Sequence, residues 1–536
     1  MRGGIASGWL ARERTVAGPG FNRWLVPPAA LAIHLSIGMA YGFSVFWLPM
    51  TRLVANPASG CTQSGWLSEL FTASCNWTVP QVSLTFTLFI AMLGISAAIW
   101  GGWLEHAGPR KAGFIAALCW GGGMFLGGIG VAIHQLWLVW LGTGILGGVG
   151  QGLGYITPVS SLIKWFPDRR GMATGFAIMG YGGGAMIGAP LAVWLMHHFP
   201  GEGVAPAMMV MGALYFLAMS AGAFGFRVPP TGWQPAGWSP PETHGKAMIT
   251  HRHVHLEKAW KTPQFWLIWA VLCLNVTAGI AVISMASPML QDIFGARLLG
   301  VDSVAALSAA QKAAIVAAAA GLVGLISLFN SLGRIGWASL SDFIGRKNTY
   351  YTFFVLGILV YVLLPTWGHL GIPALFVVSI CIILTMYGGG FSTVPAYLAD
   401  IFGTQMVGAI HGRLITAWSA AGIIGPVLIA NLRQFQLAHG VVRNDVYDLT
   451  LYIMAGLLFA GLVCNYFVRP VKDAHYMTDE ELARESSLQH EDRIAGDPAH
   501  AARGAFGGGG MLAWLAVGVP FLIGLYIALE KAAALF

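Results

Sequence analysis

The stretch Glu105-His106-Ala107-Gly108-Pro109-Arg110-Lys111 follows an apolar run that is long enough to cross a membrane. A stretch of the same pattern, Asp342-Phe343-Ile344-Gly345-Arg346-Lys347, begins 237 positions later and also follows an apolar run. In each stretch an acid ends the helix, a glycine permits the chain to reverse and two cations follow. Gly188 and Gly425 lie the same 237 positions apart. The recurrence predicts a chain of two related halves, an organisation that many transporters share.

The composition indicates that these apolar runs lie in a membrane. Of the 536 residues, 56% are hydrophobic and only 10% are charged, whereas soluble domains carry about 25% charged residues. The high hydrophobicity excludes a disordered chain, and apolar runs of about 20 residues without alternation exclude a transmembrane β-barrel. The net charge of +7 comes from cations in short loops rather than from a basic soluble domain, so we expect no nucleic-acid partner.

The order of the apolar runs predicts the architecture. Six runs of spanning length precede a polar linker, six more follow it, and another lies near the C-terminus. We therefore expect an all-α integral membrane protein of two six-helix halves, 12 transmembrane helices in all, and an added 13th helix. The predicted divisions are a cytoplasmic N-terminal segment (1–24), an N-terminal half (25–226), a cytoplasmic linker (227–263), a C-terminal half (264–468), a cytoplasmic tail (469–510) and the extra helix (511–530).

The distribution of lysine and arginine predicts the orientation of these helices. With the N-terminus inside, 22 of the 29 cations fall on the cytoplasmic side and six on the outer side. Because positive charge accumulates in cytoplasmic loops, we expect a cytoplasmic N-terminus. The first apolar run is too long for a signal peptide and lacks a small-residue cleavage site. The expected location is the bacterial inner (plasma) membrane, as a multi-pass protein.

One cation, Arg334, belongs to neither side of the membrane. It precedes Asp342 by eight residues, which is about 12 Å along a helix at 1.5 Å per residue. An arginine at that depth costs at least about 2.5 kcal/mol and marks a functional site. All 22 acids lie in loops, the tail or span ends, which leaves little room for the alternative of a structural ion pair. A guanidinium matches a carboxylate with two parallel hydrogen bonds, so we expect an anionic ligand.

The same inventory of acids bears on energy coupling. Many proton symporters use a buried carboxylate as the proton site, and no Asp or Glu lies near the middle of the apolar runs here. Exchange of one anion for another is therefore the simpler expectation. His34, near the middle of the first run, is the other titratable candidate for a proton site. A lone histidine on an apolar helix is more often a packed, hydrogen-bonded residue, so proton symport stays an alternative.

Three further motifs narrow the identification. Lys164-Trp165-Phe166-Pro167-Asp168-Arg169-Arg170-Gly171 opens the fifth run, Thr262-Pro263-Gln264-Phe265-Trp266 opens the seventh, and Asp400-Ile401-Phe402-Gly403 follows the tenth. Together with the repeated turn, these motifs resemble the major facilitator superfamily, and within it the oxalate/formate antiporter family, over roughly residues 25–468. The resemblance implies a secondary active transporter that works by alternating access and binds small carboxylates between its two halves.

The resemblance also implies a set of substrate-binding residues. The family places an arginine in the eighth helix, which corresponds to Arg334 here, and its oxalate carrier adds a lysine where this chain has Trp418. A dianion in a dry pocket needs about two compensating cations. With one cation in the pocket, a monocarboxylate such as formate, lactate or pyruvate is favoured, unless Arg413 supplies the second charge. The implied binding residues are Arg334, Asn330, Tyr41, Tyr155, Tyr387, Phe391 and Trp418.

The repeated turn suggests a gate on the cytoplasmic side. In one state its acid could pair with cations at the ends of neighbouring helices and hold that side shut; the plainer alternative is a positive-inside turn without a gating role. The candidate gating residues are Glu105, Gly108, Arg110, Asp342, Gly345 and Arg346.

The remaining features carry weaker expectations. Cys61 and Cys75 share the long outer loop, where a disulfide is as plausible as two free thiols. The histidines of the linker, His244 among them, indicate an interfacial segment more than a metal site, and no phosphate-binding loop for ATP occurs. We therefore expect no metal, no cofactor and no enzymatic activity, and a functional monomer whose partners are a small organic anion and membrane lipid. A carrier of a different solute, a membrane enzyme and a non-transporting sensor are the other classes weighed.

Overall fold

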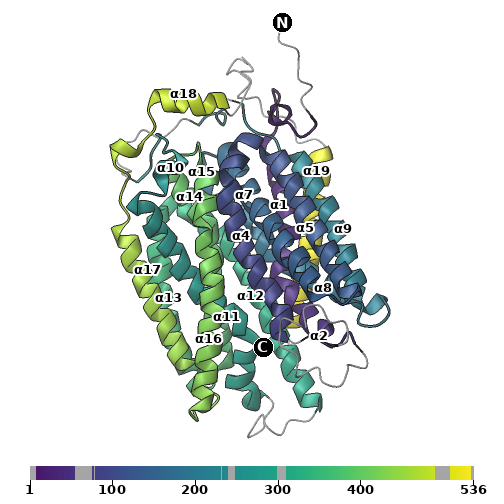
Figure 1. Cartoon of the computed structure of the whole chain (residues 1–536). Helices are drawn as coiled ribbons and strands as arrows, with labels where there is room; N and C mark the ends of the chain where they lie inside the picture. The colour runs from purple at the N-terminus through teal and green to yellow at the C-terminus, as the bar shows by residue number, and fades with distance from the viewer. Residues whose placement is uncertain are drawn as a thin grey trace.

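A computed structural model describes residues 8–54, 75–77, 79–230, 232–238, 248–298, 309–488 and 508–532. Long helices run roughly along one common axis, with the early helices beside the late ones (Figure 1). Within the described residues the β structure is confined to two isolated bridges, Val16 to Val228 and Val254 to Tyr476. Helices dominate because in lipid every backbone N–H and C=O must be satisfied within the protein.

The N-terminal half is built from six spans. The first begins as an α-helix and continues as a 3₁₀-helix, and the fourth contains a π-helical turn. The elements are α1 (Val26–Ile37) with η3 (Gly38–Phe46), α4 (Val79–Ala107), α5 (Pro109–Ala132), α6 (Leu136–Val139) with η4 (Trp140–Leu146) and α7 (Gly147–Trp165), α8 (Arg170–His198), and α9 (Val204–Gly225).

The C-terminal half repeats this order. The eleventh span of the chain is broken at Ile415 into a short helix, α15, and a longer helix, α16. The elements are α11 (Pro263–Leu298), α12 (Ala309–Ile344), α13 (Arg346–Leu370), α14 (Pro373–Phe402), α15 (Val407–Leu414) with α16 (Thr416–Ala438), α17 (Asp448–Phe467), and the final helix α19 (Gly508–Ala532).

The expected membrane architecture is confirmed. Twelve helical segments of the described chain, α19 among them, are long and apolar enough to cross a membrane. The 36-residue α12 is long enough as well, so α19 fits the expected thirteenth span. The linker and the tail, expected only as polar segments, contain the short helix α10 (Leu256–Ala259) and the helix α18 (Asp479–Leu488).

The added helix α19 lies at the edge of the bundle (Figure 1), with side chains such as Leu512 and Tyr526 largely exposed. Its inner face nevertheless contacts both halves of the protein. Phe521 and Leu525 pack against a small cluster formed by Met186 of α8 and Leu328 of α12. The helix therefore covers part of the seam between the two halves.

Close helix packing positions the interior of the C-terminal half. A Cβ atom added at Gly333 of α12 would meet the backbone carbonyl of Thr385 in α14, and one added at Gly388 of α14 would meet that of Asn330 in α12. The two backbones approach this closely because neither glycine has a side chain. The contact presses α14 against the turn of α12 that carries Arg334.

A glycine pair on α12 tests this packing. We expect Gly333→Ala to lower the thermal midpoint in detergent, because overpacking a dense core costs about 1–3 kcal/mol. Gly336→Ala is the matched control on the same helix, since a Cβ there meets nothing within 4 Å, and it should leave the midpoint unchanged or slightly raised. Equal midpoints for the two variants, measured by differential scanning fluorimetry, would show that the α12–α14 contact is not close.

Candidate functional site

The side chain of Arg334 lies fully buried where α12 meets α8 of the other half. Its Nε donates to Oδ1 of Asn330 at 3.1 Å, and its Nη1 donates to the carbonyl oxygen of Ile178 in α8 at 3.2 Å. Within the described part of the chain, Nη2 has no hydrogen-bond partner and no acid forms an ion pair with the guanidinium. A buried charge with one unused donor therefore sits between the two halves.

Aromatic rings enclose this guanidinium. Its carbon lies 5.7 Å from the ring centre of Tyr181 on α8 and 5.3 Å from that of Phe391 on α14. The indole of Trp418 on α16 closes the group, with ring centres 4.6 Å from Phe391, 5.2 Å from Tyr181 and 5.5 Å from Tyr155 on α7. Ring faces attract the cation, and the rings exclude water from it.

A tyrosine pair also spans the two halves at this depth. The hydroxyls of Tyr41 on η3 and Tyr387 on α14 lie 3.1 Å apart, which is hydrogen-bond distance. Tyr41 packs edge-on against Tyr181 at 5.2 Å, and Tyr387 packs against Phe391 at the same distance. We call Arg334 and its surrounding rings the aromatic cage, which comprises Tyr41, Tyr155, Tyr181, Tyr387, Phe391, Trp418 and Arg334.

Several polar atoms of the cage have no partner. The hydroxyls of Tyr155 and Tyr181 and the indole Nε1 of Trp418 are buried and make no hydrogen bond to any described residue, as is also true of Nη2 of Arg334. An unmade hydrogen bond of this kind costs about 1–3 kcal/mol. These four groups, from four helices, can all donate, so the cage is suited to a ligand that supplies acceptor oxygens and negative charge.

The structure brings together all seven residues that the sequence and the resemblance assigned to substrate binding. It adds two that sequence reasoning missed, Tyr181 and His411. Tyr181 stands between Gly180 and Gly182 on α8, and small neighbours at a single large ring are a weak signal of close helix contact. His411 precedes Trp418 by seven residues, a spacing that places both on one helix face and was available from the sequence.

His34 occupies a different place from the cage. Its Nδ1 lies 2.5 Å from the carbonyl oxygen of Ala177 in α8, and its Nε2 lies 3.2 Å from that of Tyr155 in α7. The ring is fully buried and joins three helices of the N-terminal half. The geometry is that of a packed, hydrogen-bonded histidine, and its role as a proton site stays a prediction.

Asp342 connects the halves on the cytoplasmic side. Its Oδ1 accepts from the backbone N–H of Gly171 at 2.9 Å, and its Oδ2 accepts from that of Met172 at 3.0 Å. Both N–H groups belong to the first turn of α8, where a carboxylate also interacts favourably with the helix dipole. Arg346 donates to the same carboxylate at 2.6 Å. Gly345, at φ +87°, provides the reversal between Asp342 and Arg346.

Glu105 occupies the related position in the other half, where Gly108, at φ +82°, provides the reversal. Its carboxylate accepts from Lys164 at 2.7 Å and from Ser160 at 3.0 Å, both on α7. A Cβ added at Gly408, in the first turn of α15, would meet this carboxylate. Gly408 follows Gly171 by the same 237 positions that separate the two turns, so each acid lies against the start of a helix of the opposite half.

Arg110, the first cation after Gly108, was expected as a gating residue. Its Nη1 donates to the carbonyl oxygen of Trp9 at 3.3 Å. The cation that neutralises Glu105 is Lys164, which lies 59 residues along the chain. Sequence proximity to the turn therefore did not reveal the ion pair.

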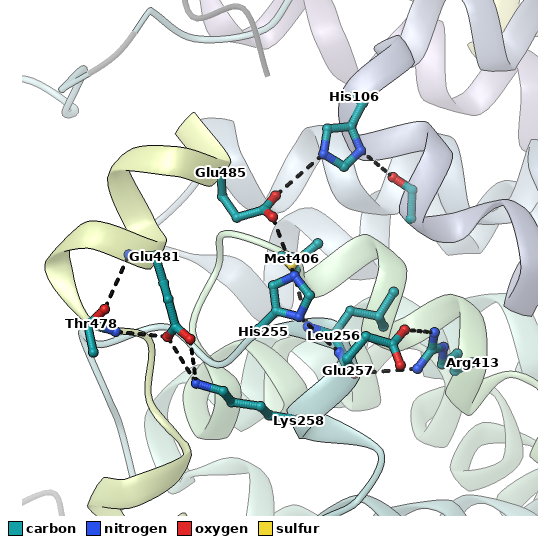
Figure 2. A network of polar contacts seen from close by, with 11 residues as sticks. His106, His255, Leu256, Glu257, Lys258, Met406, Arg413, Thr478, Glu481 and Glu485 are labelled. Atoms are coloured by element: carbon teal, nitrogen blue, oxygen red, sulfur yellow. Dashed lines mark hydrogen bonds and ion pairs between the residues drawn. The ribbon is translucent and has the colours of Figure 1, made fainter. Parts of the chain in front are cut away.

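The tail helix α18 lies across one end of the helix bundle (Figure 1), and Figure 2 shows its contacts. Glu485 of α18 lies 3.4 Å from Nε2 of His106, at the end of α4, and 3.4 Å from Nε2 of His255 in the linker. Glu481 accepts from Lys258 of α10 at 2.9 Å, and this lowers the pKa of Glu481. The tail thus connects the linker to the N-terminal half.

Arg413, the expected alternative source of a second cation for the site, is used elsewhere. Its guanidinium donates to the carboxylate of Glu257 in α10 (Figure 2). That hydrogen bond lowers the pKa of Glu257, so the carboxylate remains ionised and the pair persists at neutral pH. Arg413 is therefore held beside the linker helix α10 and does not reach the aromatic cage.

Among the described residues, one group of side chains is close enough together to hold a metal ion. It is far from the cage in sequence and does not contact it. His369, Asp445 and Asp448 hold their ligand atoms within 4.8 Å of one another. They already form ion pairs, with His369 Nε2 at 2.8 Å from Asp448 and 3.3 Å from Asp445. In the outer loop, Cys75 is disulfide-bonded, and Cys61 lies outside the described residues.

Comparison with known proteins gives the family. The model of the Major Facilitator Superfamily matches residues 21–426 and 309–532. The oxalate:formate antiporter of Oxalobacter formigenes is 30% identical over 341 residues, which cover 62% of this chain and 71% of the relative. The apicoplast pyruvate carrier 1 of Toxoplasma gondii is 25% identical over 322 residues, which cover 51% of this chain and 55% of that carrier.

Solved structures agree on the fold. A variant of the Escherichia coli fucose:proton symporter aligns with a TM-score of 0.53 at 13% identity, covering 84% of this chain and all of that one (100%). The human organic anion transporter MFSD10 aligns with a TM-score of 0.51 at 14% identity, covering 83% and 99%. The resemblance drawn from the sequence motifs is confirmed, and with it the expectation of a transporter rather than an enzyme. The chain belongs to the Major Facilitator Superfamily.

Proposed function

We propose that this protein is a secondary active transporter of small carboxylates, with monocarboxylates such as formate, lactate or pyruvate favoured, and that it works by anion exchange in the bacterial inner membrane. The observation that carries the proposal is the buried guanidinium of Arg334, which has an unused donor and no acid paired with it among the described residues. A carboxylate in the aromatic cage supplies both the missing charge and the missing acceptor.

Charge balance favours exchange. An empty cage leaves the positive charge of Arg334 without a counter-charge in a dry environment, which makes reorientation of the unloaded protein costly. A bound monoanion neutralises that charge. The loaded protein can therefore move between its two states more readily than the empty one, and one anion moves in when another moves out.

The same balance selects the substrate charge. A dianion would leave about one negative charge uncompensated, because Arg413 is paired with Glu257 at the cytoplasmic surface. Trp418 adds an N–H donor without adding charge. The printed names of two relatives, an oxalate:formate antiporter and a pyruvate carrier, support small carboxylates as a class.

Proton-coupled symport of a monocarboxylate is the second candidate. His34 supports it, because both of its ring nitrogens face carbonyl oxygens and only an imidazolium donates from both nitrogens. Carriage of a different small solute is disfavoured by the charge in the cage. Uptake into vesicles without internal anion, driven by a pH gradient, distinguishes symport from exchange.

Alternating access requires the cytoplasmic contacts to break. We infer that Asp342 and Glu105 hold the halves together on that side, with Gly108, Gly345, Arg110 and Arg346 shaping the two turns. Asp342 supports this inference most directly, because it accepts two hydrogen bonds from the opposite half. Opening toward the cytoplasm would release these bonds and expose the cage to that side.

Loss of the charge of Arg334 tests the proposed anion site. We expect Arg334→Gln to weaken monocarboxylate binding by more than tenfold, since a charge-assisted hydrogen bond is worth about 1.5–3 kcal/mol. Binding is measured by equilibrium dialysis with labelled formate, lactate and pyruvate. Arg433→Gln is the control, because Arg433 pairs with Asp292 away from the cage. Unchanged binding by a folded Arg334→Gln protein would contradict the proposal.

Anion-exchange assays on variants of Trp418 test the preferred charge of the substrate. In proteoliposomes preloaded with formate, the wild-type protein should take up labelled formate, lactate or pyruvate, and unlabelled oxalate should compete poorly. Trp418→Lys, which adds a second cation, should raise the potency of oxalate by tenfold or more relative to formate. Trp418→Phe is the control for lost volume and should not. If oxalate outcompetes monocarboxylates in the wild type, the one-cation argument is wrong.

Asp342 allows the gate to be tested. We expect Asp342→Asn to weaken the cytoplasmic closure, because its amide cannot accept the two N–H bonds with a full negative charge. The reporter is a cysteine at Ser160, which lies against Gly408 of the other half, and its labelling by N-ethylmaleimide should become several-fold faster. Asp473→Asn, which removes a 92% exposed partner of Arg252, is the control. Equal labelling in both variants would remove Asp342 from the gate.

A further inference from the structure

His411 is a buried histidine that the proposed mechanism does not use. Its side chain is fully buried, and neither ring nitrogen makes a hydrogen bond to any residue that the structure describes. A neutral imidazole has one donor and one acceptor, and burying both without hydrogen-bond partners is costly. His34 differs, because both of its nitrogens face carbonyl oxygens.

The position of His411 places it in the cytoplasmic closure. It lies on α15, whose Gly412 presses against the carbonyl oxygen of Ala97 on α4 in the other half. Its ring packs 5.7 Å from that of Tyr155, the cage residue on α7. It precedes Trp418 by seven residues, or about 10 Å along a helix. His411 therefore sits between the cage and the cytoplasm, where the halves must part for release on that side.

The charged and titratable groups around His411 do not neutralise an imidazolium. The only carboxylate of α4 near α15 is that of Glu105, which is engaged with Lys164 and Ser160 of α7. Arg413 on the same helix and Arg334 in the cage are cations. The acids of the elements packed against α15 are Glu105 on α4, Asp400 on α14, Glu257 on α10 and Asp292 on α11, and each is already paired with a cation: Lys164, Arg346, Arg413 and Arg433 respectively. The other titratable groups near the ring are Tyr155 on α7 and His34 on α1.

We propose that His411 is a proton-binding site of the cytoplasmic gate, and that it must release its proton to the cytoplasm before the gate can close. When the halves part, water reaches the ring and the free nitrogen takes a proton. Closure returns the ring to a dry pocket without a counter-charge, so the proton leaves the same nitrogen first. The inference rests on alternating access as proposed above, but it does not depend on which solute is carried.

The sign of the resulting pH effect follows from linkage. The open gate binds the proton and the closed gate does not, so a lower cytoplasmic pH shifts the protein toward the open gate. With an ordinary histidine pKa of about 6.5 in the hydrated open state, lowering the pH from 7.5 to 5.5 should change the open-to-closed ratio by up to about tenfold. Acid on the outer side should have no such effect.

The experiment uses the cysteine at Ser160 in the full chain, reconstituted in liposomes, with Cys119, Cys273, Cys381 and Cys464 replaced. N-ethylmaleimide labelling is compared at pH 5.5 and 7.5 between the parent and His411→Asn, so that the pH dependence of the reagent cancels. At each pH, the labelling rate of the parent is divided by that of His411→Asn. This ratio should be up to about tenfold higher at pH 5.5 than at pH 7.5. His411→Gln should behave like His411→Asn, and His369→Asn, at an exposed outer pair, should behave like the parent.

Equal pH dependence in the parent and both His411 variants would overturn the proposal, as would a parent response that follows outer rather than cytoplasmic pH. Formate exchange is measured on the same vesicles, and cytoplasmic acid should slow it in the parent but not in His411→Asn. Labelling that responds as expected while no carboxylate is exchanged would contradict the proposed substrate class and leave the proton site standing. Carboxylate exchange without the labelling response would overturn the proton site and leave the proposed substrate class standing.

Discussion

The rest of this structure depends on one positive charge, that of Arg334, which is buried between the two six-helix halves. Arg334 has no paired acid among the described residues, and its guanidinium bonds to Asn330 on its own helix and to the backbone of α8 in the other half. A charge in that position is costly in a dry protein interior. The surrounding rings, the unpartnered hydroxyls and the indole N–H form an environment suited to a ligand that brings negative charge and acceptor oxygens.

A second set of contacts joins the two halves near the Asp342 and Glu105 turns. Asp342 caps the first turn of α8, and Glu105 lies against the first turn of α15, so each half holds a helix end of the other. His411 is fully buried on α15 beside Tyr155 of the cage. If these contacts are the gate proposed above, the closure that excludes water from Arg334 also excludes it from His411, and substrate access is linked to protonation.

Sequence reasoning identified Arg334 because the cost of a charge in hydrocarbon depends on depth alone, and depth can be counted from Asp342. It identified the acid–glycine–cation turns because the same pattern recurs at a fixed spacing. It missed Tyr181 and His411, because the glycines beside Tyr181 and the seven-residue spacing from His411 to Trp418 do not show which side of a helix faces the partner half. It did not identify Lys164 as the partner of Glu105, because the two residues lie 59 positions apart.

The sequence by itself determined the number and order of the spans, the two related halves and the presence of one intramembrane cation. These are local properties, set by apolar run length, by the distribution of lysine and arginine and by the desolvation cost of a single residue. The tertiary structure alone decided which donors surround Arg334, that Arg413 is held by Glu257, and that α10 and α18 bridge helix ends of the bundle. Those contacts join residues 84 or more positions apart, and only helix packing brings such residues close together.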